Sequence, residues 1–422
     1  MKKYYFRNPY LLQGLVLALG LATSGFSDEL PETYTGVRPL GMGKAFTAVA
    51  NDENSVWTNP AGVTRVRKAR SRKTFSLINF PTVIGGGNDG GKSFLLNMLG
   101  KSTSKGPEVL EGILSNLDSN KSEAIWVRTG TSAMAFFDVP KGSPWVLGAF
   151  SNAKTWISPE SDTSESSLPE DTVVFIDNVT DVGGLLTLAW TNRTNRINFA
   201  LQLRPTMRYG YYDKTTLGLL LSEFKTKIRE DGNSGFGLGL DAGFMWTLAD
   251  YWFPTIGLAI KNLPTGCIDE YLNPFAEVRQ KVCGTKYSGT VNNPESPTLL
   301  DPMDLRLGLS MTPRLGRKIA LRFAVDLHHL YITPDNVTYY GLSGVEPLKQ
   351  VHAGVELFVG NPLLINPFSI RVGFNQGFLT FGGTFRVGLL ALEAAMFQQD
   401  VSSSASGEKD ERYVASLTLE FN

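Results

Sequence analysis

The sequence has no excess charge of either sign. Its 422 residues carry 40 basic and 40 acidic side chains, so the formal net charge is zero. A nucleic-acid-binding protein needs a basic surface to neutralise phosphates, so this balance argues against nucleic acid as a partner. Charged residues make up 19% of the chain, which is below the roughly 25% of an ordinary soluble domain.

Long hydrophobic runs are also missing. After the N-terminal region, no apolar stretch reaches the ~18–20 residues that a membrane helix needs, so a bundle of membrane helices is excluded. Disorder over most of the chain is excluded as well, because 42% hydrophobic residues can bury a core. What remains is a soluble β-rich protein or a membrane β-barrel, in which alternating lipid-facing and lumen-facing residues mute the hydropathy.

The first residues have the order of a secretory signal peptide. Lys2, Lys3 and Arg7 precede the apolar stretch 11–22, small residues follow, and acidic residues begin at Asp28. This order predicts a signal peptide over residues 1–27 and a mature chain that leaves the cytoplasm. A buried N-terminal helix is the alternative interpretation.

Cysteine and histidine are scarce. The two cysteines, Cys267 and Cys283, lie in one segment rich in Pro, Asn and Gly. Outside the cytoplasm we expect a disulfide between them, which would contribute about 3 kcal/mol. The three histidines, His328, His329 and His352, show no spacing typical of metal ligands. We therefore expect neither a metal site nor a cofactor.

Alternation of apolar and polar residues predicts fourteen strands. In the last one, Leu417 and Leu419 face one way and Ser416 and Thr418 the other. The predicted strands cover residues 70–80, 124–138, 145–157, 172–192, 197–213, 236–248, 252–262, 304–313, 318–330, 349–359, 368–376, 378–387, 389–399 and 411–422. A soluble sandwich would also alternate, so this pattern alone leaves both classes open.

The lengths of the links decide between the two classes. In order along the chain, the even-to-odd links are short, whereas the odd-to-even links, except a tight turn at Gly377, are long and polar. Short periplasmic turns and long external loops are typical of an outer-membrane barrel. We therefore predict an all-β fold, a transmembrane antiparallel β-barrel of about 14 strands over residues 67–422. The external loops are expected to hold short amphipathic helices at 93–99, 107–117 and 215–229.

Charged residues at inward positions of these strands have two interpretations. They would bind an anionic head group, or have a structural role, as ion-pair ladders inside the barrel or as contacts that hold the segment before the first strand; we favour the structural role. The residues concerned are Arg204, Asp241, Arg306, Arg322, Asp326, Glu356, Arg371, Arg386, Glu393 and Glu420.

No arrangement of residues predicts catalysis. Residues 86–93 match the phosphate-binding loop pattern, with Lys92 and Ser93 at its end. No alternation of strands and helices follows to build a parallel sheet, so we interpret this stretch as an external Gly-rich loop. Neither a Ser-His-Asp triad nor a carboxylate pair stands out. We expect that the protein is not an enzyme.

A segment before the first strand carries the most specific motif. It holds Arg38, the small-residue element Gly41-Met42-Gly43 with Ala45, the acidic stretch 51–53, and a turn formed by Asn59, Pro60, Ala61 and Gly62. This segment resembles the N-terminal plug of the FadL/TodX-type outer-membrane transport family, which includes PorV-like and TraF-like barrels. Lys44 departs from that pattern, as does the penultimate position of Phe421. The later strands are similar as well.

The resemblance implies a function. Residues 28–66 would form a plug with Gly41, Gly43, Asn59, Pro60, Ala61 and Gly62 as its motif. The barrel would pass hydrophobic small molecules, such as long-chain fatty acids, across the outer membrane, whose lipid surrounds it. Gly183 and Gly184 within one predicted strand would mark a kink or bulge used for passage, or would only relieve crowding. The alternative is a PorV-like assembly barrel that binds exported proteins at the cell surface.

Overall fold

The computed structural model describes most of the chain. The described residues are 34–69, 75–91, 125–137, 143–159, 173–216, 230–268, 282–292, 300–316, 318–331, 347–359, 367–400 and 409–421. The predicted signal peptide and the helices expected at 93–99 and 107–117 lie outside these residues, as does the helix expected at 215–229, except for two residues at its start that belong to a strand.

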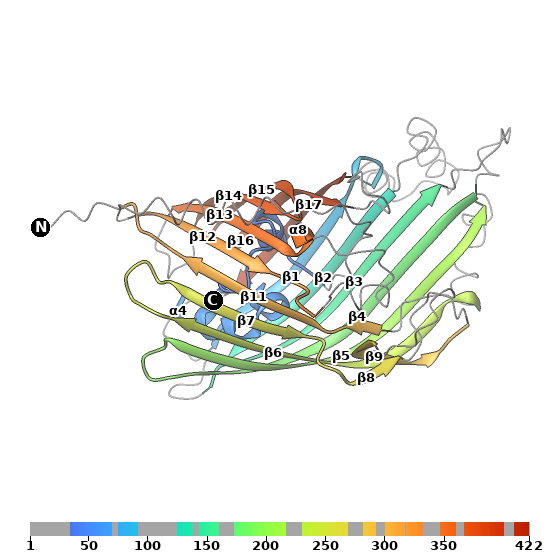
Figure 1. Ribbon diagram of the computed structural model, residues 1–422, viewed down its shortest axis with the longest axis horizontal. Helices are drawn as coiled ribbons and strands as arrows, with labels where there is room; N and C mark the ends of the chain where they lie inside the picture. Colours follow the sequence, from blue (N-terminus) through green and yellow to red (C-terminus); the bar gives the residue numbers. More distant parts are fainter. Residues whose placement is uncertain are drawn as a thin grey trace, which may run out of the picture.

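Fourteen antiparallel strands close into a barrel (Figure 1). Each strand pairs with the next in the circuit, and the last pairs with the first. The strands are β1 (Phe75–Gly87), β2 (Ile125–Phe137), β3 (Trp145–Pro159), β4 (Val173–Thr191), β5 (Ile197–Thr216), β6 (Asn233–Thr247), β7 (Thr255–Lys261), β11 (Asp304–Met311), β12 (Ile319–Leu327), β13 (Val351–Val359), β14 (Phe368–Asn375), β15 (Phe378–Val387), β16 (Leu390–Asp400) and β17 (Lys409–Phe421). The predicted fold class and strand count are confirmed.

The first strand lies later in the chain than predicted. The sequence predicts it over 70–80, followed by a loop, but β1 runs from Phe75 to Gly87 and takes in Pro81 and the glycines after it. Its pairing shifts between Asn79 and Val83 on the β17 side. A bulge there accommodates a proline, which has no amide hydrogen for the ladder. The stretch that we interpreted as a Gly-rich loop therefore begins inside a strand.

The long link over 263–303 is not simply a loop. It contains three short strands, β8 (Gly266–Ile268), β9 (Val282–Thr290) and β10 (Leu300–Pro302). The strand β9 pairs with β6 over Ser234–Gly237, beyond the end of β7, and β8 and β10 pair with β9. We call these three strands the loop-end extension. The sequence did not predict these strands, because they are short and lie in a segment rich in Pro, Asn and Gly.

The outer surface of the barrel is apolar. Large hydrophobic side chains point outward from the strands and remain exposed, for example Leu147, Phe199 and Leu417. A soluble protein does not expose so extensive an apolar surface, whereas lipid covers it in a bilayer. The barrel is therefore a membrane barrel of the outer-membrane type. No helix among the described residues is long and apolar enough to span a bilayer.

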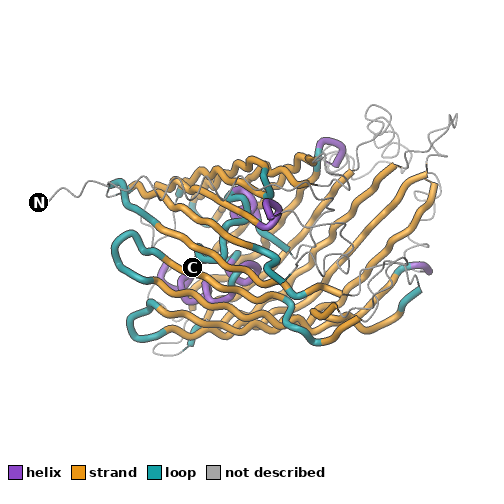
Figure 2. Tube along the Cα trace, in the orientation of Figure 1, coloured by secondary structure: helices purple, strands orange, loops and turns teal. Residues whose placement is uncertain are grey.

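Residues 34–69, the inner segment, lie inside the barrel (Figures 1 and 2). They form α2 (Val37–Gly41), α3 (Ser55–Thr58), the 3-10 turn η1 (Pro60–Gly62) and α4 (Val63–Ala69). These short helices contact β14, β15, β16 and β17 on one side and β4, β5 and β6 on the other. The inner segment occupies the end of the barrel that bears the short links, here called the turn end, and the other end is the loop end.

Candidate functional site

The inner segment fills the lumen where it lies. Its side chains from Thr35 to Thr64 are buried except for that of Asn51. Phe46, Val56 and Trp57 belong to one hydrophobic cluster with residues of the barrel wall. Fully burying one such side chain contributes about 1.5–3 kcal/mol. These contacts explain how a chain with little regular structure adopts a fixed conformation.

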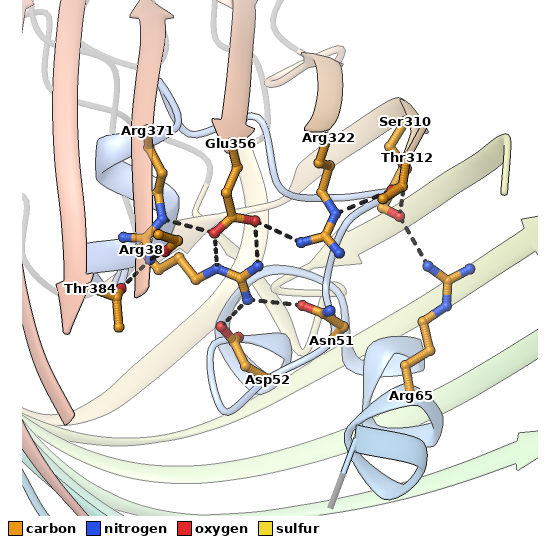
Figure 3. A network of polar contacts seen from close by, with 12 residues as sticks. Arg38, Asn51, Asp52, Arg65, Ser310, Thr312, Arg322, Glu356, Arg371 and Thr384 are labelled. Atoms are coloured by element: carbon orange, nitrogen blue, oxygen red, sulfur yellow. Dashed lines mark hydrogen bonds and ion pairs between the residues drawn. The ribbon is translucent and has the colours of Figure 1, made fainter. Parts of the chain in front are cut away.

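An ion-pair network joins the inner segment to the wall (Figure 3). Arg38 donates two hydrogen bonds to Glu356 on β13, from Nε at 2.9 Å and from Nη2 at 2.6 Å. Glu356 also accepts from Arg322 at 2.7 Å and from Arg371 at 3.0 Å. One buried carboxylate therefore accepts hydrogen bonds from three guanidinium groups. Such charge-assisted bonds are roughly twice as strong as neutral ones.

Arg38 also connects two parts of the inner segment. Its Nη1 lies 2.5 Å from Asp52 Oδ2 and donates to Asn51 Oδ1 at 2.9 Å. Burial alone would raise the pKa of Asp52, but the charge of Arg38 holds that pKa below its ordinary value. Arg38 thus connects the acidic stretch of the motif to the barrel wall.

The wall also binds the backbone of the inner segment. Asp326 Oδ2 on β12 accepts from the amides of Phe46 at 2.7 Å and Thr47 at 2.6 Å. Lys44 Nζ donates to Gln399 on β16 at 3.2 Å. These contacts satisfy polar groups that would be costly to bury without partners.

Glycines on the wall allow this close approach. They lie on six strands of the barrel and face the inner segment. The members of this glycine row are Gly243, Gly257, Gly308, Gly354, Gly373 and Gly382. Gly257 is paired with Gly308, and Gly354 with Gly373. A Cβ at Gly257 would lie 2.5 Å from the carbonyl oxygen of Thr47, so only glycine leaves room for the inner segment.

The glycines of the motif have matching roles. Gly43 adopts φ +63°, and a Cβ there would lie 2.5 Å from the carbonyl oxygen of Ala353 and from Phe374 N. Gly41 lies against the backbone of Gly382, and a Cβ at Gly62 would lie 2.5 Å from the carbonyl oxygen of Ala50. Both a left-handed conformation and a lack of space therefore favour glycine at position 43.

The Asn59–Gly62 turn fixes the second half of the inner segment. Asn59 Oδ1 accepts from the amide of Ala61 at 3.1 Å, and Pro60 begins η1. The side-chain amide of Asn59 donates to the carbonyl of Thr47 at 2.8 Å and lies 3.2 Å from that of Phe244 on β6. This one side chain joins both halves of the inner segment to the wall.

Of the ten charged residues predicted to face inward, eight are buried and Arg386 is half-buried, as expected for inward positions. The side chain of Glu420 lies outside the described ones, so its prediction stays untested. Several form ion pairs with one another, such as Asp241 with Arg204 at 3.3 Å, and Asp241 also pairs with Lys261, which the prediction did not include, at 3.0 Å. The structural interpretation of these charges therefore holds for the pairs formed within the wall. Glu356 and Asp326 also hold the inner segment.

One side of the lumen is apolar instead. Met134 and Phe136 on β2, Val146 and Phe150 on β3, and Leu185 on β4 are buried and belong to the cluster around Trp57. The ring of Phe150 meets that of Trp57 edge to face, with 5.1 Å between centroids. Barrel interiors are ordinarily polar, so this apolar wall is a distinctive feature.

The apolar wall ends where the pairing of β4 and β5 is interrupted. The ladder joins Gly183 to Thr206 and resumes at Leu186 with Leu203, with Gly184 and Leu185 between them unpaired in the register. Pro205 of β5 lies in this interval and has no amide hydrogen to donate. The register is the same on both sides, so the two glycines form no bulge. A Cβ at Gly183 would collide with the carbonyl oxygen of Pro205, whereas one at Gly184 would fit.

Toward the loop end, ion pairs hold the loop-end extension against the wall. Arg208 of β5 binds Asp181 of β4 and Asp301 of β10, at 2.7 and 2.6 Å. The phenol of Tyr287 on β9 donates to Asp301 at 2.9 Å. Cys267 and Cys283 are joined by a disulfide and face each other across the β8–β9 ladder.

The three histidines come together although their spacing gave no sign of it. The rings of His328 and His352 are 4.1 Å apart, and His329 adjoins them. His352 Nδ1 lies 3.0 Å from the carbonyl oxygen of Gly43, so this cluster also contacts the inner segment. Among the described residues, no three His, Cys, Asp or Glu side chains are placed to hold a metal ion.

The match to a phosphate-binding loop has a different structure. Asn88 Oδ1 accepts from the amides of Gly91 at 3.0 Å and Trp126 at 3.3 Å. In a phosphate-binding loop the backbone amides donate to the anion, whereas here the amide of Gly91 donates to the side chain of Asn88. Lys92 lies outside the described residues.

Known structures share this architecture. The TodX ΔS2S3 mutant, described as a monoaromatic hydrocarbon channel, superposes with a TM-score of 0.50 at 10% identity, over 92% of this chain and 99% of that one. The chain has the fold of that channel. The toluene transporter TbuX of Ralstonia pickettii gives a TM-score of 0.49 at 10% identity, over 93% of this chain and 99% of its own. A FadL homologue of Pseudomonas aeruginosa gives 0.38 at 10% identity, with the same two coverages.

Sequence comparison adds nothing to the structural likeness. No protein-family model matches the chain. No curated protein sequence matches it either. The shared fold, and not a sequence match, therefore confirms the fold that the resemblance of residues 36–62 implied.

Proposed function

We propose that the protein is an outer-membrane channel for hydrophobic small molecules and that the inner segment is its plug. The apolar wall of β2, β3 and β4 carries this proposal. A water-filled pore would have a polar lumen throughout, whereas Phe150, Leu185 and their neighbours form an apolar surface, packed here against Trp57 of the plug, that would shield an apolar solute from water. The hydrocarbon channel with the same fold supports the same class of cargo.

Two routes past the plug are consistent with this wall. The cargo would displace the plug, or it would leave sideways where the pairing of β4 and β5 is interrupted. The second route requires less rearrangement, because the strands there lack ladder pairs at Gly184 and Leu185. It also lies next to Phe150, which contacts Gly183. We therefore propose a lateral exit at this interruption.

Mass spectrometry of organic extracts tests the cargo. Protein purified in mild detergent is expected to retain hydrophobic small molecules, and the panel should separate monoaromatic hydrocarbons from long-chain fatty acids. Phe150→Ser, in the lumen, should reduce the retained amount, whereas Phe199→Ser, on the lipid-facing side, should leave it unchanged. Equal retention in both variants, or no retained cargo in the intact protein, would reject the proposal.

The loop-end extension favours a second function, the binding of exported proteins. Its disulfide and its ion pairs to Arg208 give it a fixed position at the end that would face outward. A rigid β-surface of this kind offers strand edges to a partner. Affinity capture from culture medium separates the two functions: an exported protein that is retained by the intact chain and lost in the Cys267→Ser/Cys283→Ser variant would favour assembly.

A further inference from the structure

A pocket lies at the turn end of the barrel, between the inner segment and the wall. Its volume is about 190 Å³. The inner segment contributes Val49 and Arg65, and the wall contributes Thr255, Arg322 and the half-buried Phe253, among others. Neither the apolar wall nor the β4–β5 interruption forms part of it, so this pocket is separate from the route proposed for the cargo.

Arg65 enters this pocket without an acidic partner. Its guanidinium donates to Thr247 Oγ1 at 2.7 Å, to Thr255 Oγ1 at 3.3 Å and to the carbonyl of Ala48 at 3.3 Å. All three acceptors are neutral. Among the described residues, no carboxylate lies within ion-pair distance of this group, in contrast to the paired Arg38.

The second arginine of the pocket, Arg322, increases its positive character. In Figure 3, Arg65 projects from α4 of the inner segment and Arg322 from β12 of the wall, where its Nε donates to Thr312 Oγ1 at 3.4 Å. Arg322 binds Glu356, but that carboxylate is shared with two further arginines. The remaining charged pair of the lining is Arg196 with Asp250, whose side chains bind each other at 2.6 Å at the exposed rim.

The energetics of Arg65 agree with the geometry. Burial, reinforced by the nearby charge of Arg322, lowers the pKa of Arg65 to about 10. Both effects disfavour the charged form of Arg65. An anion bound between the two guanidinium groups would remove the repulsion and replace lost hydration.

We propose that this pocket binds an oxyanion, a carboxylate or phosphate group, between Arg65 of the inner segment and Arg322 of the wall. Guanidinium groups bind such oxygens in bidentate geometry, and both arginines belong to the lining of the pocket. Because the two arginines belong to different parts of the fold, the bound anion stabilises the plugged state. The proposal does not depend on what the barrel transports.

The oxyanion has two sources, which a ligand series distinguishes. It is a free ion of the periplasm, or the head group of an amphipathic molecule whose chain packs on Val49 and Phe253. Thermal unfolding of the full chain in detergent is measured with phosphate, acetate, hexanoate and the neutral hexanol, with chloride at equal ionic strength as the reference. Ligand that binds only the folded state raises the unfolding midpoint.

Stabilisation by phosphate or acetate above chloride supports the site and indicates a free ion. Stabilisation by hexanoate, but by none of phosphate, acetate and hexanol, supports the site and indicates a head group. If no oxyanion exceeds chloride, or if hexanol acts as strongly as hexanoate, the proposal is wrong. This series uses the unmodified protein, so it decides even where a variant does not fold.

Variants locate the effect. Arg65→Gln should weaken the binding of the active oxyanion roughly tenfold or more, which corresponds to about 1.4 kcal/mol, and Arg65→Lys should retain part of it. Arg193→Gln is the matched control, because Arg193 is exposed in the neighbouring turn and does not line the pocket. An Arg65→Gln variant that folds and still binds the oxyanion as tightly as the Arg193→Gln variant would refute the site.

Discussion

Replacing Glu356 with glutamine should release the inner segment. The substitution keeps the size of the side chain but removes the charge that faces Arg38, Arg322 and Arg371. Breaking a buried ion pair by removing one partner costs about 3–5 kcal/mol, because the other charge is left uncompensated. Glu356 accepts four hydrogen bonds from these arginines, two of them from Arg38, so we expect a loss at the upper end of that range.

Two measurements report this loss. The midpoint of thermal unfolding in detergent should fall, and the conductance in planar bilayers should rise as the inner segment leaves the lumen. Asp250→Asn is the control, because its ion pair with Arg196 is exposed and such surface pairs contribute about 0–1 kcal/mol. Arg38→Met separates the two effects, since it removes the segment's bonds but leaves Glu356 with its two wall arginines. If Glu356→Gln and Asp250→Asn behaved alike in both assays, the network would not hold the plug.

Further predictions concern Gly43, the disulfide of the loop-end extension and Asp52. Gly43→Ala should destabilise the position of the inner segment in the lumen by at least ~1–2 kcal/mol, the cost of a left-handed conformation for a residue with a Cβ, and should raise the conductance. Gly383→Ala is the control and should change neither, because a Cβ there would lie 3.7 Å from its nearest neighbour. Denatured, unreduced protein should show no reactive thiol, and Cys267→Ser/Cys283→Ser should increase proteolysis within 263–303 while the barrel stays folded; two reactive thiols would contradict this. Because Arg38 lowers the folded pKa of Asp52 below its unfolded value, the stabilisation is complete above about pH 4 and is lost as pH falls through the folded pKa; protease protection of residues 36–62 that does not change between pH 5 and pH 2 would refute it.

Alternation and link length were sufficient to predict the barrel, because each strand has to present an apolar face to lipid. Thirteen of the fourteen predicted strands overlap the observed ones closely, and only β1 is displaced. Its apolar residues are interrupted by Pro81 and followed by Gly85, Gly86 and Gly87, which read as a turn when the partner strands are unknown. The strands β8 to β10 were missed because their pairing depends on distant partners. The strand β9 pairs with the extended β6, and β8 and β10 pair with β9.

The wall residues that contact the inner segment could not be predicted from the sequence. Each member of the glycine row occupies one position in an alternating strand, and its meaning appears only when the register places Gly257 beside Gly308 and Gly354 beside Gly373. The pairing of Arg38 with Glu356 likewise joins residues 318 positions apart. Sequence signals report local conformation, whereas these contacts depend on the closure of the barrel.

The central claim is that residues 36–62 close the lumen. Single-channel recording of a variant that lacks these residues tests it most directly, because a barrel of 14 strands is too wide to be filled by the side chains of its wall alone. The account predicts that the shortened protein still assembles, as judged by heat-modifiable migration on gels, and that it conducts small ions through a steadily open pore while the intact protein stays mostly closed. An assembled variant with the same conductance as the intact protein would contradict the claim.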